Sequence, residues 1–161
     1  MKTKELLIRK AYSTDAPLLT SLAMRSKAHW GYSVEYMNAF RPELQIKSEW
    51  ILSNPTFVAI SHGHIVGFAG LLQTDDPHTG ELYYLFITPE CIGFGYGKNL
   101  WDRCLEECKN LKWTSLVIHS DPNAEAFYKK LGAVRIGEKP YPSIPGRMSP
   151  LLKYEIPAPV I

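Results

Sequence analysis

Apolar residues recur along this chain in two alternating patterns. Short runs are rich in β-branched and aromatic side chains, and longer segments have apolar positions three or four residues apart. The short runs predict strands, and two of them flank Ser61-His62-Gly63-His64, which predicts a β-hairpin with that polar tip. The predicted strands are Leu6 to Ala11, Thr56 to Ser61, Ile65 to Leu72, Glu81 to Thr88, a run ending at His119, Val134 to Gly137 and Leu151 to Ile156.

The segments with helical spacing lie between these strands. Asp121 followed by Pro122 is typical of a helix start, and Gly132 of a helix end, while Pro42 predicts the end of an aromatic-rich helix. Asp75 to Gly80 contains ordinary turn residues and predicts a solvated loop rather than a metal site. The predicted helices follow the start signal at Ser13 to Pro17 and cover Trp30 to Phe40, a turn at Lys47 to Leu52, Lys98 to Leu111 and the stretch from Asp121 to Gly132.

Composition narrows the class of protein. The 161 residues predict a single domain over 1–161, and a net charge of +2 with scattered basic residues argues against a nucleic-acid partner. No apolar stretch has signal-peptide or membrane-span length, so we expect a cytoplasmic protein without a membrane partner. Cys91, Cys104 and Cys108 suit a reducing compartment, and the last two are interpreted as small core residues rather than metal ligands.

A glycine-rich turn is the first chemical signal. The apolar run YYLFITP is followed by Gly93, Gly95 and Gly97, directly before a predicted helix. Glycines allow the backbone to approach a ligand closely, and the N–H groups and dipole of a helix start favour a pyrophosphate. The pattern therefore indicates a nucleotide-like cofactor, although a flexible turn without a ligand stays open.

A second motif lies about thirty residues later, where a strand, a capped short helix and Tyr128-Lys129-Lys130-Leu131-Gly132 follow one another. In this order and spacing, the two motifs resemble the GCN5-related N-acetyltransferase (GNAT) superfamily. The resemblance covers Leu6 to Ile156 and is specific from Glu81 to Ala133. It implies a mixed α/β (α+β) fold, with a central, mostly antiparallel sheet that contains a splayed parallel pair and has helices on both faces.

The resemblance also implies acetyl-CoA as the cofactor and assigns residues to it. The strand is expected to bulge and splay, so that main-chain groups of three residues contact pantetheine and stabilise the oxyanion. Ile92 stands where the family usually has Gln or Arg, so one side-chain contact to the pyrophosphate is expected to be missing while the backbone contacts remain. Asp121 stands where Asn is usual, with Asn123 nearby, which leaves the contact to pantetheine open. The implied cofactor-binding residues are Leu85, Phe86, Ile87, Gly93, Phe94, Gly95, Tyr96, Gly97, Lys98, Asp121, Asn123 and Tyr128.

Three residues are candidates for proton transfer. Tyr128 matches the family's tyrosine beside the thioester sulfur and is the candidate general acid, although its phenol could merely pack. Glu81 is the leading candidate base, because partial burial can raise a carboxyl pKa toward neutrality, although a purely solvated carboxylate fits equally well. His119 is a second candidate base, and a water stays possible.

The acceptor site is expected between the N-terminal helices and the loop before the last strand. Trp30, Tyr32 and Tyr36 could hold a cationic amine by stacking, and Arg147 could bind a carboxylate. Core packing of the aromatic residues and a surface salt bridge at Arg147 are equally open. The acceptor is therefore expected to be a small-molecule or peptide amine of unknown identity.

These assignments predict an N-acetyltransferase that transfers the acetyl group directly to a primary amine in a ternary complex, without a resident metal. A relay through Cys91 is less favoured because this cysteine belongs to the pyrophosphate end. The alternative is a non-catalytic acyl-CoA-binding or sensor module of the same fold, and a homodimer stays possible.

Overall fold

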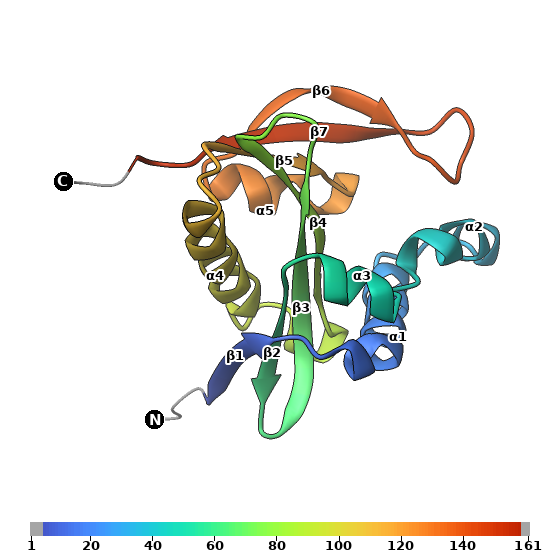
Figure 1. The fold of residues 1–161 in the computed structure, drawn as a ribbon. Coiled ribbons are helices and arrows are strands. Elements are labelled where there is room, and N and C mark those ends of the chain that lie inside the picture. Colours follow the sequence, from blue (N-terminus) through green and yellow to red (C-terminus); the bar gives the residue numbers. More distant parts are fainter. Residues whose placement is uncertain (1–4, 159–161) are drawn as a thin grey trace.

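The computed structural model describes residues 5–158, which form one seven-stranded sheet covered by helices (Figure 1). The strand order is β1-β2-β3-β4-β5-β7-β6, and all neighbours are antiparallel except the parallel pair β4 and β5. The strands are β1 (Leu6–Lys10), β2 (Thr56–Ser61), β3 (His64–Gln73), β4 (Thr79–Ile87), β5 (Ser115–His119), β6 (Val134–Pro140) and β7 (Met148–Glu155). The mixed fold class is confirmed; the single-domain prediction also includes 1–4 and 159–161, outside the described residues.

Helices cover both faces of the sheet, as predicted. On one face α4 and α5 pack against the strands in a core that contains Leu100, Trp101 and Tyr128. On the other face α1, α2 and α3 enclose a second core around Leu19, Phe40 and further apolar residues. The helices are α1 (Ala16–Ala28), α2 (Val34–Leu44), α3 (Ser48–Ser53), α4 (Tyr96–Asn110) and α5 (Glu125–Lys130), with short 3-10 helices η1 (Ser13–Asp15), η2 (Pro89–Cys91) and η3 (Pro122–Ala124).

The sheet splits between β4 and β5. Their parallel ladder pairs Thr79–Leu82 with Ser115–Ile118 and ends there, while β4 continues to Ile87 along β3. Tyr83 has no partner on β3, because Leu82 pairs with Leu71 and Tyr84 with Gly70, so β4 bulges at this residue. The expected bulge and splay are confirmed, and within residues 5–158 no strand lies beside β4 beyond the bulge on its β5 side. In Figure 1 the paired strands β6 and β7 cross the end of the sheet formed by β2, β3 and β4.

The predicted aromatic helix was wrong at both ends. Trp30 and Gly31 lie in a turn, where Gly31 has a φ of +83°, and α2 begins only after Ser33, whose side chain accepts a hydrogen bond from the Tyr36 N–H. Pro42 does not end α2, which continues to Leu44. A proline this close to the end removes one backbone donor, and the buried Leu44 anchors the last turn.

Further boundaries differ from the predicted ones: β6 runs to Pro140 rather than Gly137, and β7 begins at Met148 rather than Leu151, so both strands are longer than predicted. Thr79 and Gly80 belong to β4 rather than to the loop, because Gly80 leaves room for Trp113: an added Cβ would lie 2.0 Å from the Trp113 Cζ3 atom. Helix α4 begins at Tyr96, two residues before the predicted start. The hairpin tip is confirmed, with His62 and Gly63 at φ values of 52° and 79°, as a two-residue turn of the I′ kind requires.

Candidate active site

A cavity of about 850 Å³ lies along the split in the sheet. Its walls come from the open part of β4, the glycine-rich loop, the segment after β5 and the ends of α1 and α2. Among the predicted site residues, Phe94, Tyr32, Tyr36 and Arg147 do not line it. Those that do are Trp30, Glu81, Leu85, Phe86, Ile87, Gly93, Gly95, Tyr96, Gly97, Lys98, His119, Asp121, Asn123 and Tyr128.

The open edge of β4 forms one wall. Leu85, Phe86 and Ile87 pair with Ala69, Phe68 and Gly67 of β3 on one side only. An unpaired strand edge presents N–H and C=O groups that a ligand with amide groups can meet as a further strand would. The wall can therefore bind an extended, amide-containing arm through the main chain.

The glycine-rich loop forms the wall at one end. Gly93 and Gly95 have φ values of +92° and +86°, a left-handed conformation that favours glycine, and Gly95 is the N-cap of α4. The N–H groups of Gly97 and Lys98 lie in the first turn of α4, where no intrahelical acceptor exists. This arrangement suits an anionic group at the helix start.

Side chains around the loop point in different directions. Tyr96 is buried, and its hydroxyl lies 3.4 Å from the Ser61 Oγ atom. Lys98 forms an exposed ion pair with Asp102 at 2.8 Å. Ile92 is 42% exposed and lines the cavity where the resemblance leads one to expect a polar side chain. The loop therefore offers mainly backbone groups to an anion.

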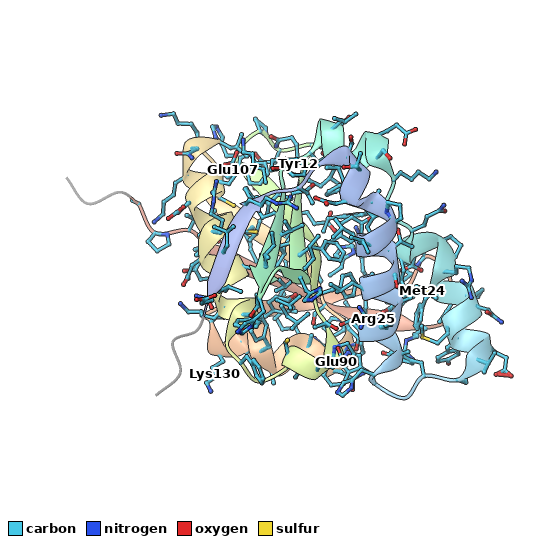
Figure 2. The ribbon with its side chains drawn as sticks, turned by 90° about the horizontal axis from the view of Figure 1, so that it is seen from below. Tyr12, Met24, Arg25, Glu90, Glu107 and Lys130 are labelled. Atoms are coloured by element: carbon cyan, nitrogen blue, oxygen red, sulfur yellow. The ribbon has the colours of Figure 1, made fainter. Side chains whose placement is uncertain are left out.

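The turn before the loop is fastened to α1. Arg25 donates a hydrogen bond to Thr88 Oγ1 at 2.9 Å and lies 3.5 Å from Glu90, and Thr88 donates to Glu90 at 2.6 Å. Figure 2 shows Arg25 and Glu90 on neighbouring elements of this face. These contacts fix the entry to the glycine-rich loop against α1.

Tyr128 lies in the cavity wall on α5. It is 6% exposed, its ring lies 6.1 Å from that of Trp101 and 5.1 Å from that of Phe127, and burial raises the pKa of its phenol. A phenol with a raised pKa stays protonated at neutral pH. Tyr128 is therefore in the protonation state that a proton donor needs.

Glu81 and His119 line the cavity from the two parallel strands. Burial raises the pKa of Glu81, and the charge of Lys139 opposes this shift. Burial lowers the pKa of His119, and Lys139 lowers it further. Both groups thus have environments that favour their neutral, uncharged forms.

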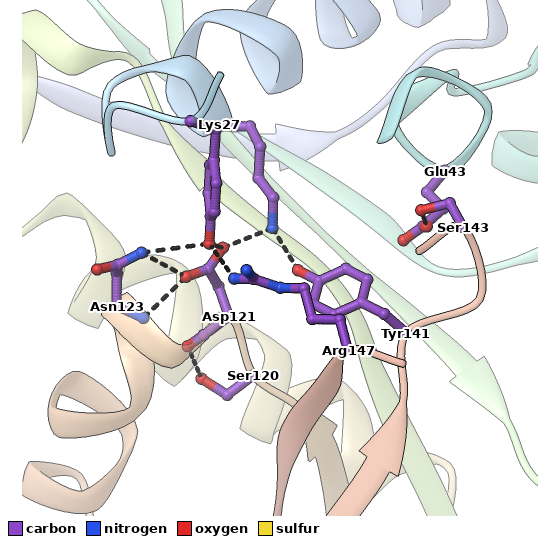
Figure 3. A network of polar contacts seen from close by, with 9 residues as sticks. Lys27, Glu43, Ser120, Asp121, Asn123, Tyr141, Ser143 and Arg147 are labelled. Atoms are coloured by element: carbon purple, nitrogen blue, oxygen red, sulfur yellow. Dashed lines mark hydrogen bonds and ion pairs between the residues drawn. The ribbon is translucent and has the colours of Figure 1, made fainter. Parts of the chain in front are cut away.

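A buried ion pair in the cavity wall joins the end of α1 to the segment after β5 (Figure 3). Lys27 Nζ lies 2.5 Å from Asp121 Oδ2 and donates to the Tyr141 hydroxyl at 2.6 Å. Asp121 also accepts from the Tyr32 hydroxyl at 2.7 Å, and from the backbone and side-chain amides of Asn123 at 2.8 and 2.9 Å. The Asp121 carboxylate is therefore fully occupied by protein donors, and its predicted contact with pantetheine stays a prediction.

The two charges of this pair respond differently to burial. Burial lowers the pKa of Lys27, against the raising effect of Asp121. Burial alone would raise the pKa of Asp121, but the charge of Lys27 and the hydrogen bonds from Lys27, Asn123 and Tyr32 hold it below its ordinary value. Asp121 is therefore ionised at neutral pH.

The predicted acceptor residues surround this pair. Arg147 donates a hydrogen bond to the Tyr32 hydroxyl at 2.9 Å. Its guanidinium lies 5.1 to 5.3 Å from the ring centres of Tyr32, Tyr36 and Tyr141. Its Nε atom is buried without a hydrogen-bond partner among the described residues. Arg147 thus forms no salt bridge in the described part of the chain. Trp30 is 43% exposed at the cavity wall, so it does not fill core.

Three further residues of the cavity wall were not named from the sequence, although Lys27 lies in the segment Ser26 to Tyr32 that the resemblance places at the acceptor site. Lys27, Glu43 and Tyr141 line the cavity, and Glu43 accepts a hydrogen bond from Ser143. Burial raises the pKa of Glu43, and the charge of Lys27 opposes this shift. Among residues 5–158 no group of three or more His, Cys, Asp or Glu side chains could hold a metal ion.

The acetyltransferase (GNAT) family model matches residues 23–133, which include the glycine-rich loop, the open edge of β4 and Tyr128. The chain belongs to this family. It is therefore an N-acetyltransferase with the fold that the sequence resemblance implied.

Relatives of this N-acetyltransferase agree with the assignment. The 5-NmdU N-acetyltransferase of Pseudomonas phage PaMx11 is 27% identical over 133 residues, which cover 83% of this chain and 90% of the relative. A GCN5-related N-acetyltransferase from Rhodopseudomonas palustris has a TM-score of 0.79 at 21% identity, covering 96% of this chain and 98% of its own. The PaiA N-acetyltransferase of Thermoplasma acidophilum, in complex with coenzyme A, has a TM-score of 0.76 at 20% identity, covering 94% and 99%. In residues 5–158, no helix is long and apolar enough to span a membrane.

Proposed function

We propose that this N-acetyltransferase uses acetyl-CoA and transfers the acetyl group directly to a primary amine in a ternary complex. The observation that carries the proposal is one continuous cavity that joins the glycine-rich start of α4, the open edge of β4 and Tyr128. Backbone groups of Gly93 to Lys98 would hold the pyrophosphate, and those of Leu85, Phe86 and Ile87 the pantetheine arm. Gly97 lets the Phe127 ring pack closely on the first turn of α4, because an added Cβ would lie 3.2 Å from the Phe127 Cζ atom.

Each catalytic step is assigned to a side chain in the cavity wall. Acetyl-CoA supplies the acetyl group as a thioester; the transfer forms a C–N bond and breaks the C–S bond. Glu81 takes one proton from the ammonium, directly or through a water, so that the neutral amine attacks the thioester carbonyl. Tyr128 gives a proton to the leaving thiolate, and the second proton that the nitrogen loses restores the phenol. Main-chain N–H groups of the open edge of β4 stabilise the oxyanion. His119 is the alternative base, because it also lines the cavity with a pKa lowered toward the neutral form.

The acceptor would lie at the end of the cavity near Trp30, Glu43 and Tyr141. Besides Asp121, which is paired with Lys27, the carboxyl groups of Glu43 and Glu81 line the cavity. Carboxylates attract an amine that arrives as a cation, and exposed aromatic rings such as Trp30 can stack on it. The cysteines in the described residues are free, which fits the reducing cytoplasm predicted from the sequence.

The test measures acetyl-CoA binding by calorimetry and CoA release with a panel of amines. The panel contains n-butylamine, benzylamine, 5-NmdU, a peptide with a free N-terminus and a peptide with an internal lysine. Saturable binding and amine-dependent CoA release are expected, with the acetylated amine identified by mass spectrometry. Binding without release across a broad panel would support the sensor alternative, and no binding would refute the cofactor assignment.

A further inference from the structure

Polar contacts join the segments on the two sides of the split in the sheet (Figure 3). On one side are the end of α1, the turn after it and α2; on the other are the segment after β5 and the loop between β6 and β7. Lys27 contacts Asp121 and Tyr141 across the split, and Tyr32 contacts Asp121 and Arg147. We call these five residues, Lys27, Tyr32, Asp121, Tyr141 and Arg147, the strap.

Lys27 is the centre of the strap. Its side chain is 9% exposed, its ammonium lies 4.5 Å from the ring centre of Phe40, and its two hydrogen-bond acceptors come from segments 94 and 114 residues later in the chain. A buried lysine that loses its carboxylate partner leaves an uncompensated charge, so the partners are held together. The end of α1 and the segment after β5 can therefore separate only if this pair is broken.

Asp121 is the one strap residue that also belongs to the expected cofactor-binding set. The glycine-rich loop is fastened to α1 through Arg25 and Thr88, and Tyr128 packs against Trp101 of α4. Neither contact involves a strap residue. Loss of the strap should therefore leave the pyrophosphate end and the candidate acid in place while it releases the loop from Tyr141 to Arg147.

We propose that Lys27 is a positioning residue that closes the acceptor end of the cavity and holds the amine against the thioester. This inference rests on the proposed function, and it identifies which part of the wall selects an amine over water. With the strap intact, the Tyr141 to Arg147 loop and the α1–α2 turn form a fixed wall. Without it, the wall opens, so aminolysis falls while the thioester stays bound and open to hydrolysis.

The central experiment compares Lys27→Met with the wild type, using acetyl-CoA and the best amine of the panel. Because misplacement by about 1 Å can cost about a hundredfold in rate, kcat/KM for the amine is expected to fall about tenfold to a hundredfold. The acetyl-CoA Kd should stay nearly the same, and amine-independent hydrolysis should persist or rise. Hydrogen exchange should accelerate in the Tyr141 to Arg147 loop and not in α4.

A double variant separates positioning from simple stability. Lys27→Met with Asp121→Asn removes both charges and keeps an acceptor for the backbone N–H of Asn123. Its melting temperature should recover toward the wild-type value, because no unpaired charge is left buried, while aminolysis stays low. Lys153→Met is the matched control, since it breaks an exposed ion pair with Glu155 on β7 and should change none of these readouts.

Unchanged aminolysis in a folded Lys27→Met variant would overturn the inference, as would recovery of aminolysis together with stability in the double variant. If Lys27→Met does not fold, Tyr141→Phe removes only one hydroxyl of the strap and should shift the ratio of aminolysis to hydrolysis in the same direction. An unchanged ratio of aminolysis to hydrolysis in Tyr141→Phe would also contradict the inference. A wild type that neither binds acetyl-CoA nor releases CoA would instead refute the proposed function, and the exchange comparison would still report whether Lys27 holds the loop.

Discussion

The ring of Phe127 lies so close to Gly97 that an added Cβ at the glycine would sit 3.2 Å from the Phe127 Cζ atom. Gly97 belongs to the first turn of α4 and Phe127 to α5, next to Tyr128. Helix α4, which carries the expected pyrophosphate-binding backbone groups, therefore meets α5, which carries the candidate acid, at a glycine. This contact couples the two functions in space.

Gly97→Ala should have opposite effects on binding and on stability. The new methyl displaces Phe127 and narrows the backbone approach, so the acetyl-CoA Kd should weaken about tenfold, or about 1.4 kcal/mol. Alanine is favoured over glycine inside a helix by roughly 0.5–1 kcal/mol, so the melting temperature should not fall. Calorimetry and thermal unfolding measure the two effects. Gly137→Ala, at a position with open space, is the control; equal affinity in both variants would contradict the prediction.

Local sequence patterns predicted the elements that local chemistry determines. The hairpin at His62-Gly63 and the start and end signals at Asp121 and Gly132 could be found because each needs a particular residue type at one backbone conformation. The helix end predicted at Pro42 was wrong for the opposite reason: the tendency of proline to end a helix was outweighed by burial of Leu44. The glycine-rich loop was identified because its residues are consecutive.

The contacts at the acceptor end of the cavity could not be predicted from local sequence patterns. The contacts of Lys27 join segments about a hundred residues apart, and a lysine at the end of an amphipathic helix ordinarily indicates a solvated position. The bulge at Tyr83 likewise depends on pairing with β3, which leaves no trace in the apolar pattern of β4 itself. Chain topology, rather than any local motif, brings these groups together.

Ile92→Arg should tighten binding of coenzyme A. Ile92 is exposed at the cavity wall beside Gly93, where a guanidinium could meet the pyrophosphate. At low salt the gain should be about twofold to fivefold, the range of an exposed ion pair, and it should shrink as salt screens the charges. Ile136→Arg adds the same charge at an exposed position of β6 and serves as the control. Absence of any gain at low salt would mean that the loop does not contact the pyrophosphate.

Tyr128→Phe should lower turnover without loosening the cofactor. If the phenol protonates the thiolate in the transition state, kcat should fall roughly tenfold to a thousandfold while the acetyl-CoA Kd changes little. The ring contacts with Trp101 and Phe127 are kept in this variant. Tyr154→Phe, whose ring also contacts Trp101, controls for the loss of a hydroxyl in the same core. Turnover within about twofold of the wild type would leave Tyr128 only a packing role.

Lys139→Met should move the acid limb of the pH–rate profile to higher pH. The charge of Lys139 lowers the pKa of both Glu81 and His119, so its removal raises both. A base acts only when deprotonated, so kcat/KM for the amine, which falls as pH drops through the pKa of the base, should begin to fall at a higher pH in the variant. Added salt should reduce the difference, because Lys139 is exposed. Lys109→Met, on α4, removes a charge that acts on neither group and should leave the limb unchanged.

Glu81→Gln and His119→Gln then identify the base, because the variant that lacks the base loses the acid limb altogether. An acid limb that does not move in Lys139→Met would exclude both residues as the base.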